Sequence, residues 1–232
     1  SNPNTPVSGQ IDTLYTDRAG MLWIGTFASG LNRYDPYSEQ FTLYRHDPND
    51  PSSLSSDAVR AIYEDAAGTL WVGTLDGGLN RLDRATGRFT HYRHDPNDPY
   101  SLNDDWVADI LDDGNGGLWV ATRGGLNRFD PATGRFTAHR HNPADPGSIG
   151  GDTVATLFRD SAGALWAGVT GAGLYRYDEA SRRFTGYAGL PNTNVVDIAE
   201  TTPGQLWVAT YGGGPYRLDV PSGRFTNFNS LT

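Results

Sequence analysis

Two aspartates are the residues of this sequence best suited to acid/base chemistry. Asp109 and Asp197 stand at equivalent positions of two β-prone segments, where related segments carry Thr13, Ala61 and Thr156. Two carboxyl groups separated by roughly 5 to 10 Å can hydrolyse a glycosidic bond. The sequence around them shows no further feature of an acid/base pair. We therefore expect these aspartates to be hydrogen-bonded or solvated and to line a central channel. The sequence therefore predicts no catalytic residue.

Oxygen-rich loops are the first candidate metal sites. Asp47, Asn49 and Asp50 form such a cluster, which recurs at Asp95, Asn97 and Asp98. Calcium prefers oxygen ligands of this kind. However, prolines interrupt both loops and the EF-hand spacing is absent, which favours aspartates that form turns. We expect no metal ion here.

Two histidines could contribute zinc ligands. His139 and His141 are two residues apart in a β-prone segment, so they lie on one side of it. His141 occupies the same repeat position as His46 and His94, which indicates a structural role. Nucleotide-binding, serine-hydrolase and zinc-protease motifs are absent, and we expect no cofactor.

Aromatic and charged residues at variable loop positions could bind a ligand. The residues that follow the recurring LWxxT element differ in every copy, as do those that precede the first β-prone segment of each copy. The candidate ligand-binding residues are Phe27, Asp76, Trp106, Arg123 and Tyr211. Aromatic planes stack on sugar faces, and arginine binds a carboxylate with two hydrogen bonds. The set predicts a carbohydrate or small-anion site around one opening, with ordinary loop variation as the alternative.

The composition limits the partners of the 232-residue chain. Its net charge is −9 and its pI is about 4.8, so a surface that binds nucleic acid is not expected. Cysteine and lysine are both missing, which excludes disulfides, thiol nucleophiles and lysine Schiff bases. No apolar run reaches the roughly 20 residues that span a bilayer, so direct membrane insertion is not expected.

All of these residues lie within a sequence repeat. Leucine precedes tryptophan at Trp23, Trp71, Trp119, Trp166 and Trp207, at intervals of 48, 48, 47 and 41 residues. Such periods are typical of repeats that stack to bury their apolar faces. Each copy contains four short β-prone segments joined by turns rich in Asp and Gly, which predicts a four-stranded meander.

The predicted fold is an all-β propeller of five four-stranded antiparallel blades in a single domain, residues 1–232. The expected blades span approximately residues 10–46, 58–94, 106–141, 153–187 and 194–228. Apolar residues stand three apart in each first strand, for example Val59 and Ile62. Since positions three apart lie on opposite faces of a regular strand, we expect sheets covered on both faces. The recurring tryptophans and phenylalanines are expected to pack between blades.

The repeat resembles that of the two-component regulator propeller family. The resemblance rests on an ED-type turn followed by LWVGT, GGLNRLD and TGRFTHYRHDPNDPSSL, and it extends from about Gln10 to Phe228. It implies a sensory propeller of a bacterial signalling protein, located in the periplasm or otherwise outside the cytoplasmic membrane. It also implies neighbouring domains that carry the output. Family propellers commonly have seven blades, whereas this chain carries five, as a fragment or as a compact ring.

These observations predict a non-catalytic ligand-sensing or interaction propeller that binds a small molecule or oligosaccharide. One alternative is a structural propeller for protein–protein contacts, which associates with itself through unpaired blade edges. Another is a polysaccharide lyase or hydrolase, which rests on fold analogy alone.

Overall fold

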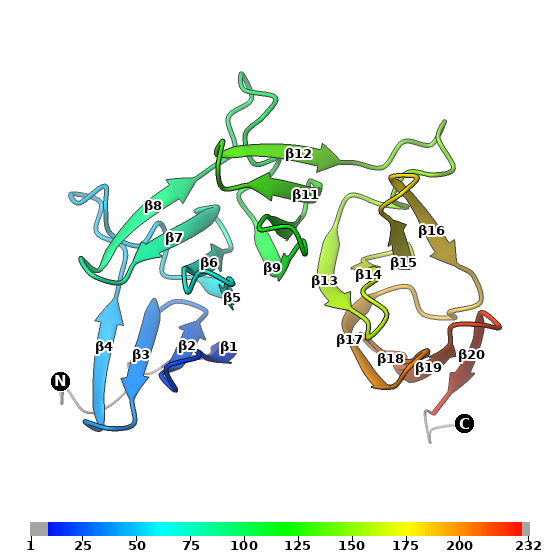
Figure 1. Ribbon diagram of the computed structural model, residues 1–232, viewed down its shortest axis with the longest axis horizontal. Coiled ribbons are helices and arrows are strands. Elements are labelled where there is room, and N and C mark those ends of the chain that lie inside the picture. Colours follow the sequence, from blue (N-terminus) through cyan, green and yellow to red (C-terminus); the bar gives the residue numbers. More distant parts are fainter. Residues whose placement is uncertain (1–8, 229–232) are drawn as a thin grey trace. The chain divides into compact units, whose positions relative to one another are not determined.

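The structure is a computed structural model and describes residues 9–228 (Figure 1). Every regular element in this range is a β-strand, and the twenty strands form five four-stranded antiparallel sheets. Within each sheet the strands follow chain order, so each sheet is a meander. The predicted all-β propeller of five four-stranded blades is confirmed.

The strand boundaries repeat closely from blade to blade. The first blade contains β1 (Ile11–Thr16), β2 (Leu22–Thr26), β3 (Leu31–Asp35) and β4 (Gln40–Tyr44). The second contains β5 (Val59–Glu64), β6 (Leu70–Thr74), β7 (Leu79–Asp83) and β8 (Arg88–Tyr92). The third contains β9 (Val107–Asp112), β10 (Leu118–Thr122), β11 (Gly125–Asp130) and β12 (Arg135–His139). The fourth contains β13 (Val154–Arg159), β14 (Leu165–Val169), β15 (Gly173–Asp178) and β16 (Arg183–Tyr187). The fifth contains β17 (Val195–Thr202), β18 (Gln205–Thr210), β19 (Gly214–Asp219) and β20 (Arg224–Asn227).

The chain forms two compact units, residues 1–120 with 128–136 and residues 121–127 with 137–232. The first unit holds the first two blades and most of the third, and the second holds the last two blades. In the first unit β1 lies against β5 and β5 against β9, whereas β13 lies against β17 in the second. First strands therefore adjoin first strands where blades stack.

Aspartate and glycine build the turn between the first two strands of a blade. Asp65 Oδ1 accepts hydrogen bonds of 2.9 Å from the amides of both Ala67 and Thr69. Gly68 takes a φ of 84°, a conformation that side chains with a Cβ rarely adopt. The same arrangement recurs around Asp17, Asp113 and Asp160. The predicted Asp–Gly turns are confirmed in the first four blades.

Within each unit the interfaces between blades are layers of aromatic and aliphatic side chains. Trp23 and Leu31 of the first blade pack with Val59, Leu82 and Phe89 of the second. Equivalent residues join the second blade to the third and the fourth to the fifth. Trp23, Trp71, Trp119 and Trp166 are almost completely buried. Within each unit the expected packing of tryptophan and phenylalanine between blades is confirmed, whereas Phe41 and Trp207 are only partly buried.

A β-bulge corrects one expectation about the first strands. Val59 pairs with Thr74 and Ala61 pairs with Gly73, so an extra residue stands between them. The bulge reverses the alternation of side chains. As a result Val59 and Ile62 point to the same face, where both join the cluster with Leu82. On the other face Ala61, Trp71 and Leu79 are buried. Both faces are therefore covered, but by other residues than the simple alternation of a strand predicts.

Candidate functional site

One end of each blade gathers three chain segments. These are the residue before the first strand, the turn between the second and third strands, and the start of the crossing to the next blade. In the first blade the Phe27 amide donates to the Gln10 carbonyl over 2.9 Å, and Leu31 pairs with Tyr44. We call this end of a blade its loop end.

The two variable positions of the repeat are joined directly by backbone hydrogen bonds. The amide of Phe27 binds the carbonyl of Gln10, and Leu75 binds Ala58, Thr170 binds Thr153 and Tyr211 binds Asn194 in the same way. All four bonds measure 2.9 to 3.0 Å. Each pair therefore presents two variable side chains from one fixed piece of backbone.

The crossings hold the turns of the loop end in place. The amides of Gly30 and Gly78 each donate a 2.9 Å hydrogen bond to the carbonyl of the aspartate that ends the crossing, Asp57 or Asp105. Gly30 has a φ of 82°, and a Cβ there would stand 2.3 Å from the Tyr44 carbonyl oxygen. Only glycine therefore fits this turn without rearrangement.

Each long crossing is also tied to the outermost strand of the next blade. The Phe89 amide donates to the Ser52 carbonyl, Phe136 to Tyr100 and Phe184 to Gly147, all over 2.8 Å. His91 Nε2 lies 2.7 Å from the Ser53 carbonyl oxygen. The crossings are therefore ordered parts of the scaffold, as their proline content predicts.

In the first unit the candidate residues Phe27, Asp76 and Trp106 all stand at loop ends. Phe27 is 51% exposed although it is aromatic, and Asp76 is exposed as well. Trp106 directly precedes β9 and is partly buried, with its amide bound to Asp104 Oδ1 over 2.7 Å. Their roles in binding remain predictions.

In the second unit Arg123 and Tyr211 stand at loop ends. Arg123 is exposed and directly follows β10. Tyr211 is 78% exposed, and its carbonyl accepts a 2.9 Å hydrogen bond from the Asn192 side chain. The Asn194 side chain in turn accepts a 3.1 Å bond from the Gly171 amide. The Tyr211 backbone thus stands beside two asparagines whose side chains are held by hydrogen bonds to the backbone.

The aspartates of the first strands, Asp109 and Asp197, accept hydrogen bonds from neighbouring backbone amides. Asp109 Oδ1 accepts the Ile110 amide over 2.8 Å, and Asp197 Oδ1 accepts the Ile198 amide over 2.9 Å. Asp197 lies beside the bulge of β17, opposite Ala209. The two aspartates belong to different units, and their role at a channel remains a prediction.

The oxygen-rich loops and the histidines are engaged in local hydrogen bonds. Asp47 Oδ1 accepts the Asn49 amide, and Asp50 Oδ1 accepts the Ser52 amide, each over 2.9 Å. His141 Nδ1 lies 2.9 Å from the Ile149 carbonyl oxygen, as His46 and His94 do from Leu54 and Leu102. Across residues 9–228 no group of three or more histidine and carboxylate side chains could hold a metal ion.

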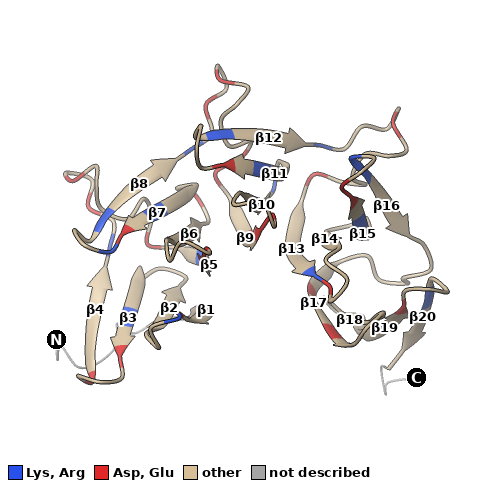
Figure 2. Cartoon of the chain, in the orientation of Figure 1, with Lys and Arg blue, Asp and Glu red and all other residues tan. Residues whose placement is uncertain are grey.

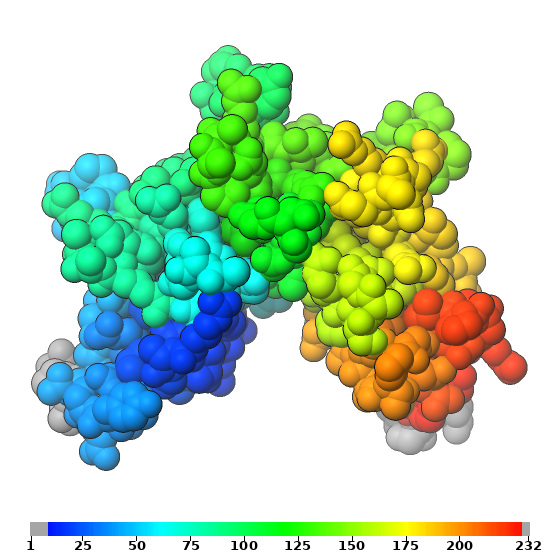
Figure 3. Space-filling view, in the orientation of Figure 1, coloured from blue at the N-terminus to red at the C-terminus, as the bar shows by residue number. Residues whose placement is uncertain are grey.

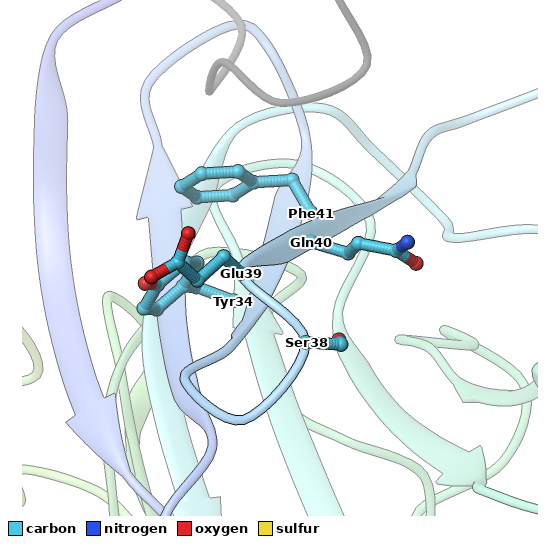
Figure 4. A pocket seen from close by; sticks show the side chains of 5 residues that line it. All are labelled: Tyr34, Ser38, Glu39, Gln40 and Phe41. Atoms are coloured by element: carbon cyan, nitrogen blue, oxygen red, sulfur yellow. The ribbon is translucent and has the colours of Figure 1, made fainter.

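Two surface hollows lie away from the loop ends. One of about 630 Å³ is lined by Tyr34, Ser38, Glu39, Gln40 and Phe41 of the first blade (Figure 4). The other, of about 420 Å³, lies by the first and third turns of the second blade. Acidic and basic positions are interspersed in both units (Figure 2).

Sequence reasoning missed an ionic cluster between the first two blades, in which two buried carboxylates bind one partly exposed arginine. Arg84 donates to Asp17 Oδ2 over 2.6 Å and to Glu64 Oε1 over 2.8 Å. Burial alone would raise the pKa of Asp17, but hydrogen bonds from Trp23, Arg84 and Met21 hold that pKa below its ordinary value. The constant spacing of six residues between the turn aspartate and the tryptophan signals the contact of Asp17 with Trp23, but no local pattern signals the pairing with Arg84.

Parts of this repeat match the sequence model of a known family. The sequence model of the two-component regulator propeller matches residues 53–76, 101–124 and 189–212. These three stretches of the chain therefore match the two-component regulator propeller repeat. Each matched stretch runs from a crossing through the LWxxT strand to the loop end that follows. A comparison of this chain with curated proteins finds no match.

Solved structures resemble this chain over nearly its whole length. Extracellular domains of two hybrid two-component system proteins from B. thetaiotaomicron match with TM-scores of 0.81 and 0.78, at 26% and 27% identity. The matches cover 95% and 98% of this chain but only 30% and 32% of those domains. Virginiamycin B lyase from Staphylococcus aureus matches with a TM-score of 0.72 at 18% identity, over all of this chain and 72% of that one, which shows a shared fold alone.

Among the residues that the structure describes, no helix is long and apolar enough to cross a membrane.

Proposed function

We propose that this two-component regulator propeller is the non-catalytic sensing part of a bacterial signalling protein outside the cytoplasmic membrane. Its similarity to extracellular domains of two-component systems supports this assignment. The chain spans about a third of those domains, so the neighbouring parts that carry the output belong to the proposal as well. We further propose that the loop ends bind a carbohydrate or a small anion.

The observation that carries the proposal is a fixed backbone that presents different side chains. In four blades the same hydrogen bond joins the two variable positions, and the crossings restrain the neighbouring turns. A binding surface preorganised in this way loses little conformational entropy when a ligand docks. Exposed aromatic rings at such positions, Phe27 and Tyr211, gain little from folding and are suited to contact a ligand.

The ligand chemistry follows from the side chains that are available. An exposed aromatic ring can stack on the apolar face of a sugar. The amide groups of Asn192 and Asn194 stand beside Tyr211 and can hydrogen-bond hydroxyl groups. Arg123 can bind a carboxylate with two parallel hydrogen bonds. Neutral oligosaccharides and uronates are therefore the first ligands to test.

A thermal-shift screen against neutral oligosaccharides and uronates tests the proposal. A ligand present at a hundredfold excess over its Kd stabilises the folded state by about 2.7 kcal/mol, which raises Tm by several degrees. We expect at least one member of the panel to do so. A panel without any stabilising member would contradict the proposed ligand class.

Two variants then locate the site. Phe27→Ala tests the first unit and Tyr211→Ala the second, and we expect at least one of them to abolish the shift. The matched control is Tyr37→Ala, which removes an exposed ring from the opposite end of the first blade. A shift that all three variants retain would place the ligand somewhere other than the loop ends.

A further inference from the structure

The crossing between the fourth and fifth blades, residues 188–194, is shorter than the three before it and joins two loop ends. Leu190 is buried in the cluster with Trp166 and Val195, which anchors the crossing between these blades. Both blades belong to the second unit, where β13 lies against β17. Figure 3 shows the fourth blade, in yellow-green and yellow, next to the fifth blade, in orange and red. The crossing therefore has a defined position against the turns of both blades.

Asn194 ties these two loop ends together. Its carbonyl accepts the Tyr211 amide over 2.9 Å, and its side-chain Oδ1 accepts the Gly171 amide over 3.1 Å. The first bond recurs in other blades, but the second does not follow from the repeat. Ala58 has no polar side chain at the equivalent position, and the side-chain amide of Gln10 binds within its own blade. One side chain thus joins the turns of the fourth and fifth blades.

Asn192 holds this arrangement with both polar atoms of its side chain. Nδ2 donates to the Tyr211 carbonyl and Oδ1 accepts the Asn194 amide, each over 2.9 Å. A Cβ at Gly213 would stand 2.6 Å from the Asn192 Cβ, so the turn of the fifth blade lies directly against this residue. Asn192 therefore fixes the backbone of both Tyr211 and Asn194.

The Asn194 side chain keeps one donor that a ligand can use. Its Oδ1 is engaged by Gly171, whereas no residue within 9–228 accepts a hydrogen bond from its Nδ2. Asn194 is exposed, and the Tyr211 side chain is 78% exposed. An amide nitrogen that is oriented in this way can donate to a hydroxyl group. An aromatic ring and a fixed donor thus stand on neighbouring pieces of backbone.

The exposure of this site recurs where a further blade follows. Thr170, which occupies the position of Tyr211 in the fourth blade, is exposed although the fifth blade packs alongside. Asp76 is exposed in the second blade, although the third blade adjoins it. Exposure of these residues is therefore a property of the loop end, whatever the place of the blade in the chain.

The residues that meet here carry no charged side chain. They are called the joint loop end and comprise Thr170, Gly171, Asn192, Asn194, Tyr211 and Gly212. Asp197, on the strand that follows the crossing, pairs with Ala209 shortly before Tyr211 and adds a negative charge. An acidic sugar would find no arginine among these residues to bind its carboxylate. The chemistry of the joint loop end therefore suits an uncharged, hydroxyl-rich ligand.

We propose that the joint loop end binds a neutral sugar. The Asn194 amide nitrogen donates to a sugar hydroxyl group, the Tyr211 ring supplies a stacking surface, and Asn192 is the positioning residue for both. This inference rests on the proposed function, which it narrows to one seat and to one class of ligand.

Isothermal titration calorimetry with cellohexaose, xylohexaose and maltohexaose as neutral probes, and with hexagalacturonate as the acidic probe, tests the proposal. We expect at least one neutral probe to bind the wild-type chain. Asn194→Asp retains the acceptor for the Gly171 amide but loses the donor. The Kd of that probe should therefore rise about tenfold.

Asn142→Asp is the matched control and should leave the Kd unchanged. It adds the same charge in the third crossing, where Asn142 is exposed and its Oδ1 likewise accepts a backbone amide, over 3.0 Å. The equivalent residues of the first two crossings are Asp47 and Asp95, so the fold tolerates this change. Circular dichroism checks the fold of every variant.

The positioning role of Asn192 is tested by a double-mutant cycle. Asn192→Ala removes both of its side-chain hydrogen bonds and should raise the Kd. If Asn192 acts by positioning Asn194, the double variant with Asn194→Asp should lose less affinity than the product of the two single losses. Losses that simply multiply would show that Asn192 does not act through Asn194, and would overturn its positioning role.

Three results would overturn this inference while the proposed function stands. They are binding of hexagalacturonate alone, a neutral probe whose Kd is unchanged by Asn194→Asp, and an equal loss of affinity in Asn142→Asp. Absence of binding by all four probes would overturn this inference and the proposed ligand class together.

Discussion

The indole nitrogen of Trp23 donates a 2.8 Å hydrogen bond to Oδ2 of Asp17, the aspartate that builds the preceding turn. Bonds of the same length join Trp71 to Asp65 and Trp166 to Asp160. One carboxylate therefore shapes the hairpin with Oδ1 and holds the largest core side chain with Oδ2. This satisfies the polar atom of a buried tryptophan, which would otherwise be costly to bury.

Replacing Asp17 by Asn should destabilise the protein by about 2 to 3 kcal/mol, because it removes the charge that binds Arg84 in a buried setting. Urea denaturation measures the change in the free energy of unfolding. Asp65→Asn is the matched control, since Asp65 makes the same turn and indole hydrogen bonds. Arg84 does not bind Asp65, so we expect the control to lose roughly half as much. Equal losses would show that the ionic cluster contributes little.

Acid should weaken the fold through Asp17 and Asp113. Burial alone would raise the pKa of Asp113, but hydrogen bonds from the Asn115 amide and from Arg128 keep its pKa lowered, as in Asp17. A group whose pKa is lower in the folded state contributes stability above its unfolded pKa, about 3.9 for aspartate. That contribution is lost as the pH falls through the lowered value.

We therefore expect the free energy of unfolding to decline below about pH 4, and urea titrations at a series of pH values measure it. Asp17→Asn should show a shallower decline, since one of the depressed groups is gone. Stability that rises as the pH falls below 4 would contradict these assignments.

The repeat tryptophans should differ in their contribution to stability. Trp71→Ala should cost about 3 to 5 kcal/mol, because a fully buried ring leaves a cavity between two blades. Trp207→Ala should cost less than half of that, since Trp207 retains contact with solvent and with Phe228. Urea midpoints of the two variants give the comparison, with Trp106→Ala as a tryptophan outside the repeat. A Trp207 variant as unstable as the Trp71 variant would indicate that the fifth blade is covered in solution.

Several features of the fold could be predicted because they depend on short stretches of chain. A turn such as Asp65 to Gly68 is specified by an aspartate oxygen that reaches nearby amides and by one glycine at positive φ. The candidate residues at the loop ends could also be proposed from sequence, since their variability within a constant frame is visible in the repeat. Their hydrogen-bonded pairing, such as Phe27 with Gln10, needed the register of the strands.

Other features were out of reach because they depend on a one-residue shift or on distant partners. The bulge between Val59 and Ala61 moves Val59 to the same face as Ile62, against the simple alternation of a strand. Arg84 reaches Asp17 across 67 positions of sequence. No local pattern encodes either outcome.

By itself, the sequence determined the number of repeats, the four strands of each blade and the turns between them, because hydrophobic alternation and turn preferences act over a few neighbouring residues. The tertiary structure alone decided which side chains share a face and which carboxylates pair with arginine. Those outcomes arise when one blade packs on the next, since only that contact sets the burial and the dielectric environment of each side chain.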